Sequence, residues 1–536
     1  MQKLTTYLLY LAAPMLFLIP TLGHAHTLMA GPGDDPKQWI FFYQQFAHCI
    51  THPTNPWYTQ QLWAPHGLSL AWATCTPLLC LLATPITLLF GPWTAYNAMA
   101  YATITANAAA AYALAKTLNA RHWPATAAGL LVAFSPFALT ELMGRPCVYT
   151  TWPITLGLAA YALYANQERT TPWFTCAATA AMTAQLYIST ETALSATLIA
   201  GLTIAIMATD PTARKTIRNT LPGLLAATAA TAALAAPYTL PMLLLPHPHG
   251  WIFDPDACAA DLLNFILPSP TQAIGGKFLQ GITKCWQTIF QEQDAYIGIP
   301  LLATATYLLY KNRTSTAAKT ITAAGTTAAL LAMGPHLEIA GIVTQIPLPF
   351  KLFTNLPLAD KLIPIRLAQY STLAAITAAA VYWPKTTHHN WNKTTGTGLL
   401  IALSLCPQSK TPYWTYTPNN PSFFTTNTYR DYIVPNQIIM ILPGTAEGNG
   451  ALFCAEDHFY WRDAAGWIGA ATQHPLYKNW LPPKQFPAWL DRHHTHTVIV
   501  PLKWIHRERP FTRTLQPICK TDGVEIYHKR PTPENP

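Results

Sequence analysis

The sequence predicts an all-α polytopic membrane protein with a small α/β domain at its carboxyl end. Of the 536 residues, 51% are apolar and only 10% are charged, against about a quarter charged in ordinary soluble domains. The apolar residues also come in runs of roughly 18 to 25, the length that crosses a bilayer core. After residue 406 the charge rises and the long apolar runs stop, which predicts a separate domain over residues 407–536.

The membrane domain covers residues 1–406. Residues 1–25 contain its first apolar run and end in Gly-His-Ala, which signal peptidase could cleave. The run is longer than a usual signal-peptide core, so we favour a retained first helix. Ala and Thr are frequent in the later runs, as expected where helices pack closely on small residues.

Short loops rich in Lys and Arg set the predicted topology. About twelve apolar segments precede residue 407. If all of them crossed the bilayer, the basic loops would lie on both sides. They all lie on one side only if residues 71–90 do not cross. That segment contains two prolines, and we expect it to be re-entrant or interfacial. We therefore predict about eleven spans, with a cytoplasmic amino terminus and an extracytoplasmic carboxyl-terminal domain. The residues placed inside are Lys3, Lys116, Arg121, Arg169, Arg214, Lys215, Arg218, Lys311, Arg313, Lys319, Lys385 and Lys393.

The outer loops then cover residues 24–70, 246–295 and 334–363 and carry most of the carboxylates. In the first loop, aromatic residues at helical spacing over 31–50 predict an amphipathic helix lying on the bilayer surface. Trp57, Tyr58 and Trp63 nearby are aromatic anchors suited to the headgroup level. Asp35 fits two roles, which are compatible. It precedes Pro36 as a helix N-cap would, and it could present its carboxylate as a general base.

Ten cysteines occur without C-x-x-C pairs or clustered histidines, so no metal site is predicted from them. An oxidising compartment would allow the pairs Cys49–Cys75, Cys258–Cys285 and Cys454–Cys519. In the final domain, residues 438–443, 497–504 and 524–530 are predicted strands, and 483–495 a helix. This domain has no phosphate loop, nucleophile elbow or metal-ligand spacing and is predicted to be accessory.

Several stretches between residue 31 and about residue 370 together resemble the C-type (GT-C) superfamily of membrane glycosyltransferases, and within it a group of large bacterial proteins. They include GPGDDPKQWIFF at 31–42, ISTETALS at 188–195, ADLLNFILPSP at 260–270, EQDAYIG at 292–298 and PLADKLIPIRLA at 357–368. The resemblance implies an inverting transferase of the bacterial inner membrane. It would move a sugar from a polyprenyl-phosphate-linked donor to an envelope acceptor on the outer face.

The resemblance also implies roles for particular residues. The superfamily's acidic residue after the first span corresponds to Asp35, with Asp34 beside it, and takes a proton from the acceptor. Arg366 and Lys361 correspond best to the basic residues that bind the lipid phosphate. Arg145 is a weaker match, because some relatives have a histidine there. Further outer-face candidates are Glu191, Asp261 and Glu292.

Some superfamily members use a divalent metal and others do not, and the sequence does not decide. Without the resemblance, Arg366 at the end of a span would pair with a carboxylate or a phosphate, and Arg145 and Glu191 would be ordinary loop charges. The alternative functions are a transporter or flippase, or a non-catalytic assembly protein, for lipid-linked saccharides. The expected partners are the lipid-linked sugar, membrane lipid and an envelope acceptor; nucleic acid is not among them.

Overall fold

The computed structural model describes residues 2–24, 27–244, 254–289, 292–356, 358–384, 391–408, 414–418, 420–469 and 482–530. The chain divides into two compact units. The first, called here the helical unit, contains Met1–Ile19, Ala100–Ala236 and His249–Trp414. The second, the loop–tail unit, contains Pro20–Met99, Pro237–Pro248 and Thr415–Pro536.

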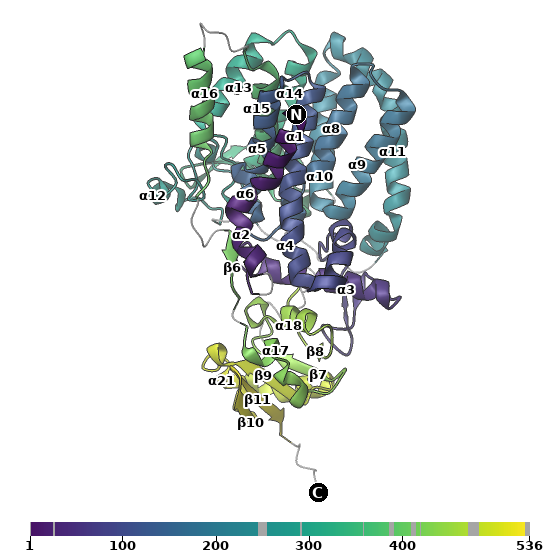
Figure 1. Ribbon diagram of the computed structural model, residues 1–536, viewed down its shortest axis with the longest axis vertical. Coiled ribbons are helices and arrows are strands. Elements are labelled where there is room, and N and C mark those ends of the chain that lie inside the picture. Colours follow the sequence, from purple (N-terminus) through teal and green to yellow (C-terminus); the bar gives the residue numbers. More distant parts are fainter. Residues whose placement is uncertain are drawn as a thin grey trace. The chain divides into compact units, whose positions relative to one another are not determined.

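Long helices running side by side make up the helical unit (Figure 1). Small residues let them approach closely: Ser371 Oγ donates to the carbonyl of Gly325 over 2.9 Å, which joins α15 to α14. The helices that lie in this unit, or enter it, are α1 (Gln2–Ala12), α2 (Met15–Gly23), α4 (Pro77–Thr117), α5 (His122–Ala133), α6 (Pro136–Leu142), α7 (Pro146–Tyr149), α8 (Trp152–Ala165), α9 (Thr171–Ile188), α10 (Thr190–Met207), α11 (Pro211–Leu244), α12 (Gln280–Thr283), α13 (Ile299–Lys311), α14 (Thr316–Ala332), α15 (Ala368–Tyr382) and α16 (Trp391–Ser404).

Shorter elements connect the helices of this unit. They are the hairpin of β4 (His336–Ile339) and β5 (Ile342–Pro347), and the 3-10 helices η1 (Leu262–Phe265), η3 (Pro349–Leu352), η4 (Ala359–Lys361) and η5 (Pro364–Leu367). The last of these, η5, leads directly into α15 and carries Arg366. The connections therefore bring the charged residues of the second and third outer loops to the ends of the long helices.

Four helical stretches among the described residues are long and apolar enough to cross a membrane: α4, α5 with α6, α10 and α11. The pair α1 and α2, bent by 46°, makes a fifth if it is one span. The Ala- and Thr-rich helix α14 has 17 residues and is not among them. The predicted count of about eleven spans therefore stays a prediction. Helix α4 is interrupted at Gly91, whose φ of 85° separates residues 77–90 from the rest.

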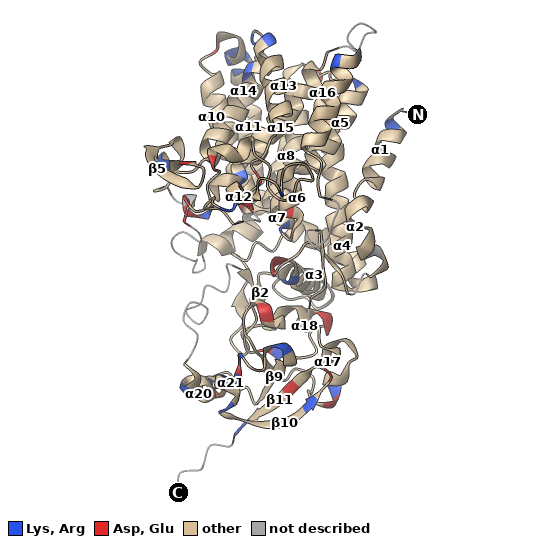
Figure 2. Ribbon diagram, turned by 90° about the vertical axis from the view of Figure 1, so that its left-hand side faces the viewer, with Lys and Arg blue, Asp and Glu red and all other residues tan. Residues whose placement is uncertain are grey.

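The basic loops share one end of the helical unit, as Figure 2 shows in blue. Arg121, between α4 and α5, donates to the carbonyl of Trp383 at the end of α15 over 2.8 Å. Lys319 in α14 pairs with Asp210 before α11. The grouping used to predict the topology is thus present in the fold, while its assignment to the cytoplasm stays a prediction. Lys385 lies outside the described residues.

A five-stranded sheet of order β10-β11-β9-β7-β8 forms the tail part of the loop–tail unit (Figure 1). Strands β7 (Ile438–Ile441), β9 (Thr497–Pro501) and β11 (Val524–Lys529), with helix α20 (Phe486–Arg492), match the predicted elements. Their core includes Trp489, Leu490 and Val498. Edge strand β10 (Leu515–Thr521) was not predicted, because Pro517 and a register shift interrupt it.

Other elements of the loop–tail unit are short. They are β1 (Met29–Ala30), α3 (Asp35–Thr51), β2 (Tyr58–Thr59), β3 (Leu68–Ser69), β6 (Thr415–Tyr416), α17 (Ser422–Thr425), η6 (Thr428–Asp431), η7 (Ala446–Gly448), α18 (Gly450–Glu456), β8 (Arg462–Asp463), η9 (Pro483–Gln485), η10 (Leu502–Trp504) and α21 (Arg509–Thr512). Two of them, β1 and β6, pair with each other and so connect the first loop to the start of the tail.

The first loop packs against the tail. Helix α3 is buried along residues 36–47 and packs against α18, with the rings of Phe41 and Phe459 5.5 Å apart. Trp63 is 8% exposed, and its ring nitrogen donates to the carbonyl of Gly466 over 2.9 Å. The tail therefore covers Trp63 and much of α3, while Tyr58 is exposed. The placement of this helix and of Trp57, Tyr58 and Trp63 at the bilayer surface stays a prediction.

All ten cysteines lie in the described residues, and each is a free thiol. The three disulfide pairs considered from the sequence are therefore not formed in this structure.

Candidate active site

The Asp34–Asp35 turn opens helix α3. Asp34, not Asp35, occupies the cap position, and its side chain makes no capping hydrogen bond. The predicted cap is therefore shifted by one residue. Asp35 is the first helical residue, followed by Pro36, and its Oδ1 accepts a hydrogen bond from Gln38 Nε2 over 3.2 Å. Both carboxylates lie at the positive end of a 17-residue helix, which favours negative charge there.

Lys37 fixes the geometry of this turn. Its Nζ pairs with Asp34 Oδ1 over 2.7 Å and donates to the carbonyl of Ala446 over 3.3 Å. Ala446 belongs to η7 of the tail, and Lys37 is only 6% exposed. The tail thus helps to position the side chain that holds Asp34.

In the helical unit, six charged side chains form one group, called here the Arg–carboxylate cluster, in which all but Glu191 and Arg366 are buried. Its members are Glu141, Arg145, Glu191, Glu292, Asp294 and Arg366. They come from α6, the turn before α7, the start of α10, the segment before α13, and η5. Five separate stretches of sequence therefore converge on one site.

Arg366 and Glu292 form the centre of the cluster. The guanidinium of Arg366 holds Glu292 with two hydrogen bonds, Nη2 to Oε1 over 2.7 Å and Nε to Oε2 over 3.2 Å. Its third nitrogen, Nη1, donates to Glu191 Oε2 over 2.7 Å. Such a planar two-point contact is what an arginine makes with a carboxylate or a phosphate.

Arg145 extends the cluster on the other side. Its Nη1 donates to Glu292 Oε1, and its Nε lies 3.1 Å from Glu141 Oε2. Glu141 is fully buried, and so is Asp294. Neither oxygen of the Asp294 carboxyl has a hydrogen-bond partner among the described residues.

The cluster holds more negative than positive charge. Four carboxylates and two guanidinium groups give a formal charge of −2 when all are ionised. Burial, together with the Glu141 and Glu292 carboxylates, raises the pKa of Asp294 well above its usual value. For Glu292, burial acts to raise the pKa, but Arg145 and Arg366 outweigh it and hold the pKa below its usual value. An additional positive charge would therefore be stabilised beside Asp294.

The remaining predicted site residues lie elsewhere in the helical unit. Lys361 pairs with Asp360 over 2.7 Å. Asp261 caps η1 by accepting from the backbone nitrogen of Leu263 over 2.8 Å, and it also accepts from the nitrogen of Gly341 over 2.7 Å. The hydrogen bond from Gly341 gives Asp261 a structural role, because it holds the turn between β4 and β5.

Two cluster members, Glu141 and Asp294, were not among the residues predicted for the site. Glu141 stands four residues before Arg145, a spacing that brings two side chains together on a helix. Asp294 stands two residues after Glu292 in a stretch that is otherwise uncharged. The four-residue spacing of Glu141 and Arg145 could have indicated Glu141, although Arg145 lies beyond the end of α6. Nothing in the local spacing indicates Asp294.

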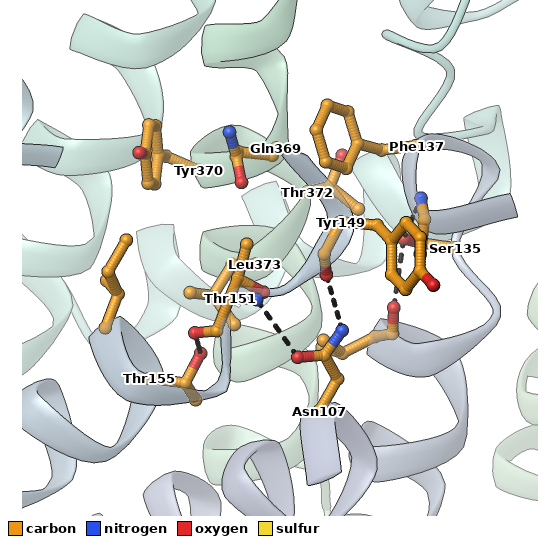
Figure 3. Close-up of a pocket in the computed structure, with 13 residues that line it drawn as sticks. Asn107, Ser135, Phe137, Tyr149, Thr151, Thr155, Gln369, Tyr370, Thr372 and Leu373 are labelled. Carbon is orange, nitrogen blue, oxygen red and sulfur yellow. Dashed lines mark hydrogen bonds between the residues drawn. The ribbon is translucent and has the colours of Figure 1, made fainter. Parts of the chain in front are cut away.

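A pocket lies among the elements that carry the cluster (Figure 3). Asn107 from α4 supports one wall: it donates to the carbonyl of Tyr149 over 2.6 Å and accepts from the nitrogen of Thr151 over 3.1 Å. Phe137 from α6 and Gln369 from α15 also line it. The pocket therefore shares α6 with Glu141. Other parts of its wall lie at the end of α7, which Arg145 precedes, and just after η5, which contains Arg366.

Three carboxylates of the cluster also fit a metal ion. One oxygen each from Glu141, Glu292 and Asp294 lies within 4.8 Å of the other two, and all three residues are buried. Carboxylate oxygens are the ligands that hard divalent cations such as Mg²⁺, Mn²⁺ and Ca²⁺ prefer. No histidine or cysteine belongs to this group among the described residues.

Residues 4–360 match the model of a family described as a domain of unknown function, DUF6311. The chain belongs to this family. No curated protein matches the chain. The family assignment covers the helical unit up to η4 and the first loop, including the Asp34–Asp35 turn and all cluster residues except Arg366.

Solved structures share the fold along nearly the whole chain. The archaeal oligosaccharyltransferase AglB from Archaeoglobus fulgidus, in complex with an inhibitory peptide and a dolichol-phosphate, is 10% identical, with a TM-score of 0.54 over 99% of this chain and 74% of that chain. ArnT from Cupriavidus metallidurans, bound to undecaprenyl phosphate, is 10% identical, with a TM-score of 0.51 over 98% and 99%. The arabinofuranosyltransferase AftD from Mycobacteria is 14% identical, with a TM-score of 0.53 over 98% and 40%. The fold is therefore that of GT-C membrane glycosyltransferases, as the resemblance implied.

Proposed function

We propose that the protein is a membrane glycosyltransferase that moves a sugar from a polyprenyl-phosphate-linked donor to an acceptor of the cell envelope. The observation that carries this proposal is the shared fold over nearly the full chain with membrane transferases, two of which were solved with a lipid phosphate. The reaction would take place on the outer face of a bacterial inner membrane, with an extracytoplasmic tail. The basic loops at one end of the helical unit support this orientation.

Asp35 is the proposed catalytic base. Asp35 is the residue that matches the superfamily's acidic position after the first span, and it accepts a hydrogen bond from Gln38, while Asp34 pairs with Lys37. Asp35 would take the proton of the acceptor hydroxyl or amine as that atom attacks the anomeric carbon of the donor. The lipid phosphate leaves from the opposite face, so the configuration at that carbon inverts. Asp34 would position the turn through its ion pair.

Arg366 is the proposed main ligand of the donor phosphate, with Lys361 and Arg145 in support. Its contact with Glu191 is a single hydrogen bond to a partly exposed carboxylate, while its contact with Glu292 is double and buried. A phosphate oxygen can therefore replace Glu191 on Nη1 more easily than it can replace Glu292. The guanidinium would stabilise the negative charge that develops on the leaving phosphate.

A deletion strain tests the proposal when it is complemented by the wild-type gene, by Asp35→Asn or by Asp431→Asn. Asp431 is an exposed carboxylate of the same unit and serves as the matched control. Mass spectrometry of envelope glycans should show one sugar missing in the deletion strain and with Asp35→Asn, and restored with Asp431→Asn. Because amide and carboxylate are nearly isosteric, Asp35→Asn should be produced at the wild-type level.

If Asp35→Asn restores the sugar as well as the wild type does, Asp35 is not the base. If the sugar is lost on deletion but restored by both Asp35→Asn and Asp431→Asn, a transporter or an assembly protein is indicated instead.

A further inference from the structure

The Arg–carboxylate cluster contains an arrangement that its own residues do not complete. Asp294 is fully buried, and neither of its oxygens has a hydrogen-bond partner among the described residues. Leaving buried polar atoms unpaired costs free energy, and more so for a charged group. Such a side chain therefore indicates a missing partner.

Glu141 shows a smaller deficit, because it has ion pairs with Arg145 and Arg366. It is fully buried, and although Arg145 lies 3.1 Å from its Oε2, neither oxygen accepts a hydrogen bond of good geometry. Oxygens of Glu141, Glu292 and Asp294 come within 4.8 Å of one another. Carboxylates of like charge gather this closely in a buried site only where positive charge or a proton compensates them. Arg145 and Arg366 compensate two of the four carboxylates of the cluster.

The charge of the cluster favours a divalent cation over a single proton. With both arginines counted, the six side chains carry a formal charge of −2. One proton would leave a buried negative charge, whereas one divalent ion or two protons would bring the cluster to neutrality. Arg145 and Arg366 do not exclude the ion, since each carboxylate oxygen has two lone pairs.

We propose that Glu141, Glu292 and Asp294 bind one hard divalent cation, such as Mg²⁺, Mn²⁺ or Ca²⁺, that neutralises the Arg–carboxylate cluster. The spacing suits such an ion, because two oxygens on opposite sides of Ca²⁺ lie about 4.6 to 5.2 Å apart and those around the smaller ions lie closer. Water would supply the remaining ligands. The cation would connect α6 to the segment before α13 and, through Glu292, to Arg366.

This site does not depend on the proposed transfer reaction and can be tested without a substrate. The full chain, purified in detergent and treated with EDTA, is incubated with Mn²⁺ and passed over a desalting column. Bound manganese is measured by mass spectrometry, and thermal unfolding is followed with and without Mn²⁺, Mg²⁺ or Ca²⁺. We expect one Mn²⁺ per chain and a Tm that rises by several degrees on adding the ion.

Asp294→Asn is the decisive variant, because it removes a charge without removing any hydrogen bond seen at that side chain. It should weaken Mn²⁺ binding at least tenfold, and the metal-free variant should unfold at a higher temperature than the metal-free wild type. Glu141→Gln is a second variant with the same expected loss of binding. Glu338→Gln is the matched control: Glu338 is a buried carboxylate of the same unit that also has an unpartnered oxygen, yet it lies outside the cluster.

The proposal fails if the wild type retains no Mn²⁺ and its Tm is unmoved by all three ions, which would leave shared protons as the neutralising charge. It fails equally if Asp294→Asn and Glu141→Gln bind Mn²⁺ as tightly as Glu338→Gln does.

Discussion

Arg366 should be the residue whose loss most destabilises the helical unit. Replacing it with Gln removes three hydrogen bonds to Glu191 and Glu292 and changes the formal charge of the cluster from −2 to −3. Breaking a buried ion pair by removing one partner costs about 3–5 kcal/mol, because the other charge stays buried without compensation. Arg366 is 12% exposed and Glu292 5% exposed, so screening by water reduces this cost little.

Glu191→Gln completes a double-mutant cycle with Arg366→Gln. By itself it should destabilise the protein less than Arg366→Gln does. It removes one charge-assisted hydrogen bond, worth about 1.5–3 kcal/mol. It also removes one negative charge from a cluster in which carboxylates outnumber guanidinium groups, and this partly offsets the loss. In the double variant the charge returns to −2, so its destabilisation should be smaller than the sum of the single values by about 1.5–3 kcal/mol.

Denaturant unfolding in detergent, after EDTA treatment, measures the free energy of unfolding of the wild type, the two single variants and the double variant. Arg313→Gln at the opposite end of the unit is the control, and it should change stability by about 0.5 kcal/mol or less. If the effects of Arg366→Gln and Glu191→Gln add to within about 0.5 kcal/mol, the two side chains do not act as a pair and the charge argument is wrong.

Three predictions concern the loop–tail unit. Lys37→Met keeps the apolar stem but frees Asp34; because Asp34 is 46% exposed, stability should fall by only about 1 kcal/mol, while glycan transfer in the complementation assay falls clearly. Gly448→Ala would place a Cβ 1.8 Å from the Pro443 carbonyl oxygen, so thermal unfolding should show a loss of about 1–3 kcal/mol or more, and an unchanged Tm would contradict the packing described. Burial raises the pKa of Asp463 to about 7, so the folded state keeps a proton that the unfolded chain releases near pH 4. Stability should therefore fall as pH rises from about 4 to about 7. Asp463→Asn should make that dependence less steep, and Asp457, whose pKa burial also raises to about 7, contributes to the part that stays.

Much of the secondary structure could be predicted because it follows local patterns. Apolar length predicted the long helices, and short runs rich in β-branched residues predicted β7, β9 and β11. The basic loops predicted which helix ends lie together. Strand β10 was missed because Pro517 hides its pattern.

The surroundings of each element could not be predicted in the same way. The spacing of the aromatic residues over 31–50 correctly predicted helix α3. The burial of this helix depends on α18, which lies some 400 residues later in the chain. Arg366 was expected to pair with a carboxylate or a phosphate, yet its partners Glu191 and Glu292 lie 175 and 74 residues away in sequence. One chain without an alignment holds no signal that would select these partners among the other acids.

The pairing of β1 with β6, and of residues near Trp63 with Ala465, has a consequence for biosynthesis. The first loop leaves the ribosome long before the tail, so Met29, Ala30 and Trp63 cannot make their native contacts until residues after 414 have been translated. A chain that ends early would expose the first loop's backbone donors and its buried aromatic residues. The native conformation of the Asp34–Asp35 turn thus depends on the last quarter of the polypeptide. We expect a truncated chain to be degraded faster than the full chain, because its first loop stays exposed to proteases.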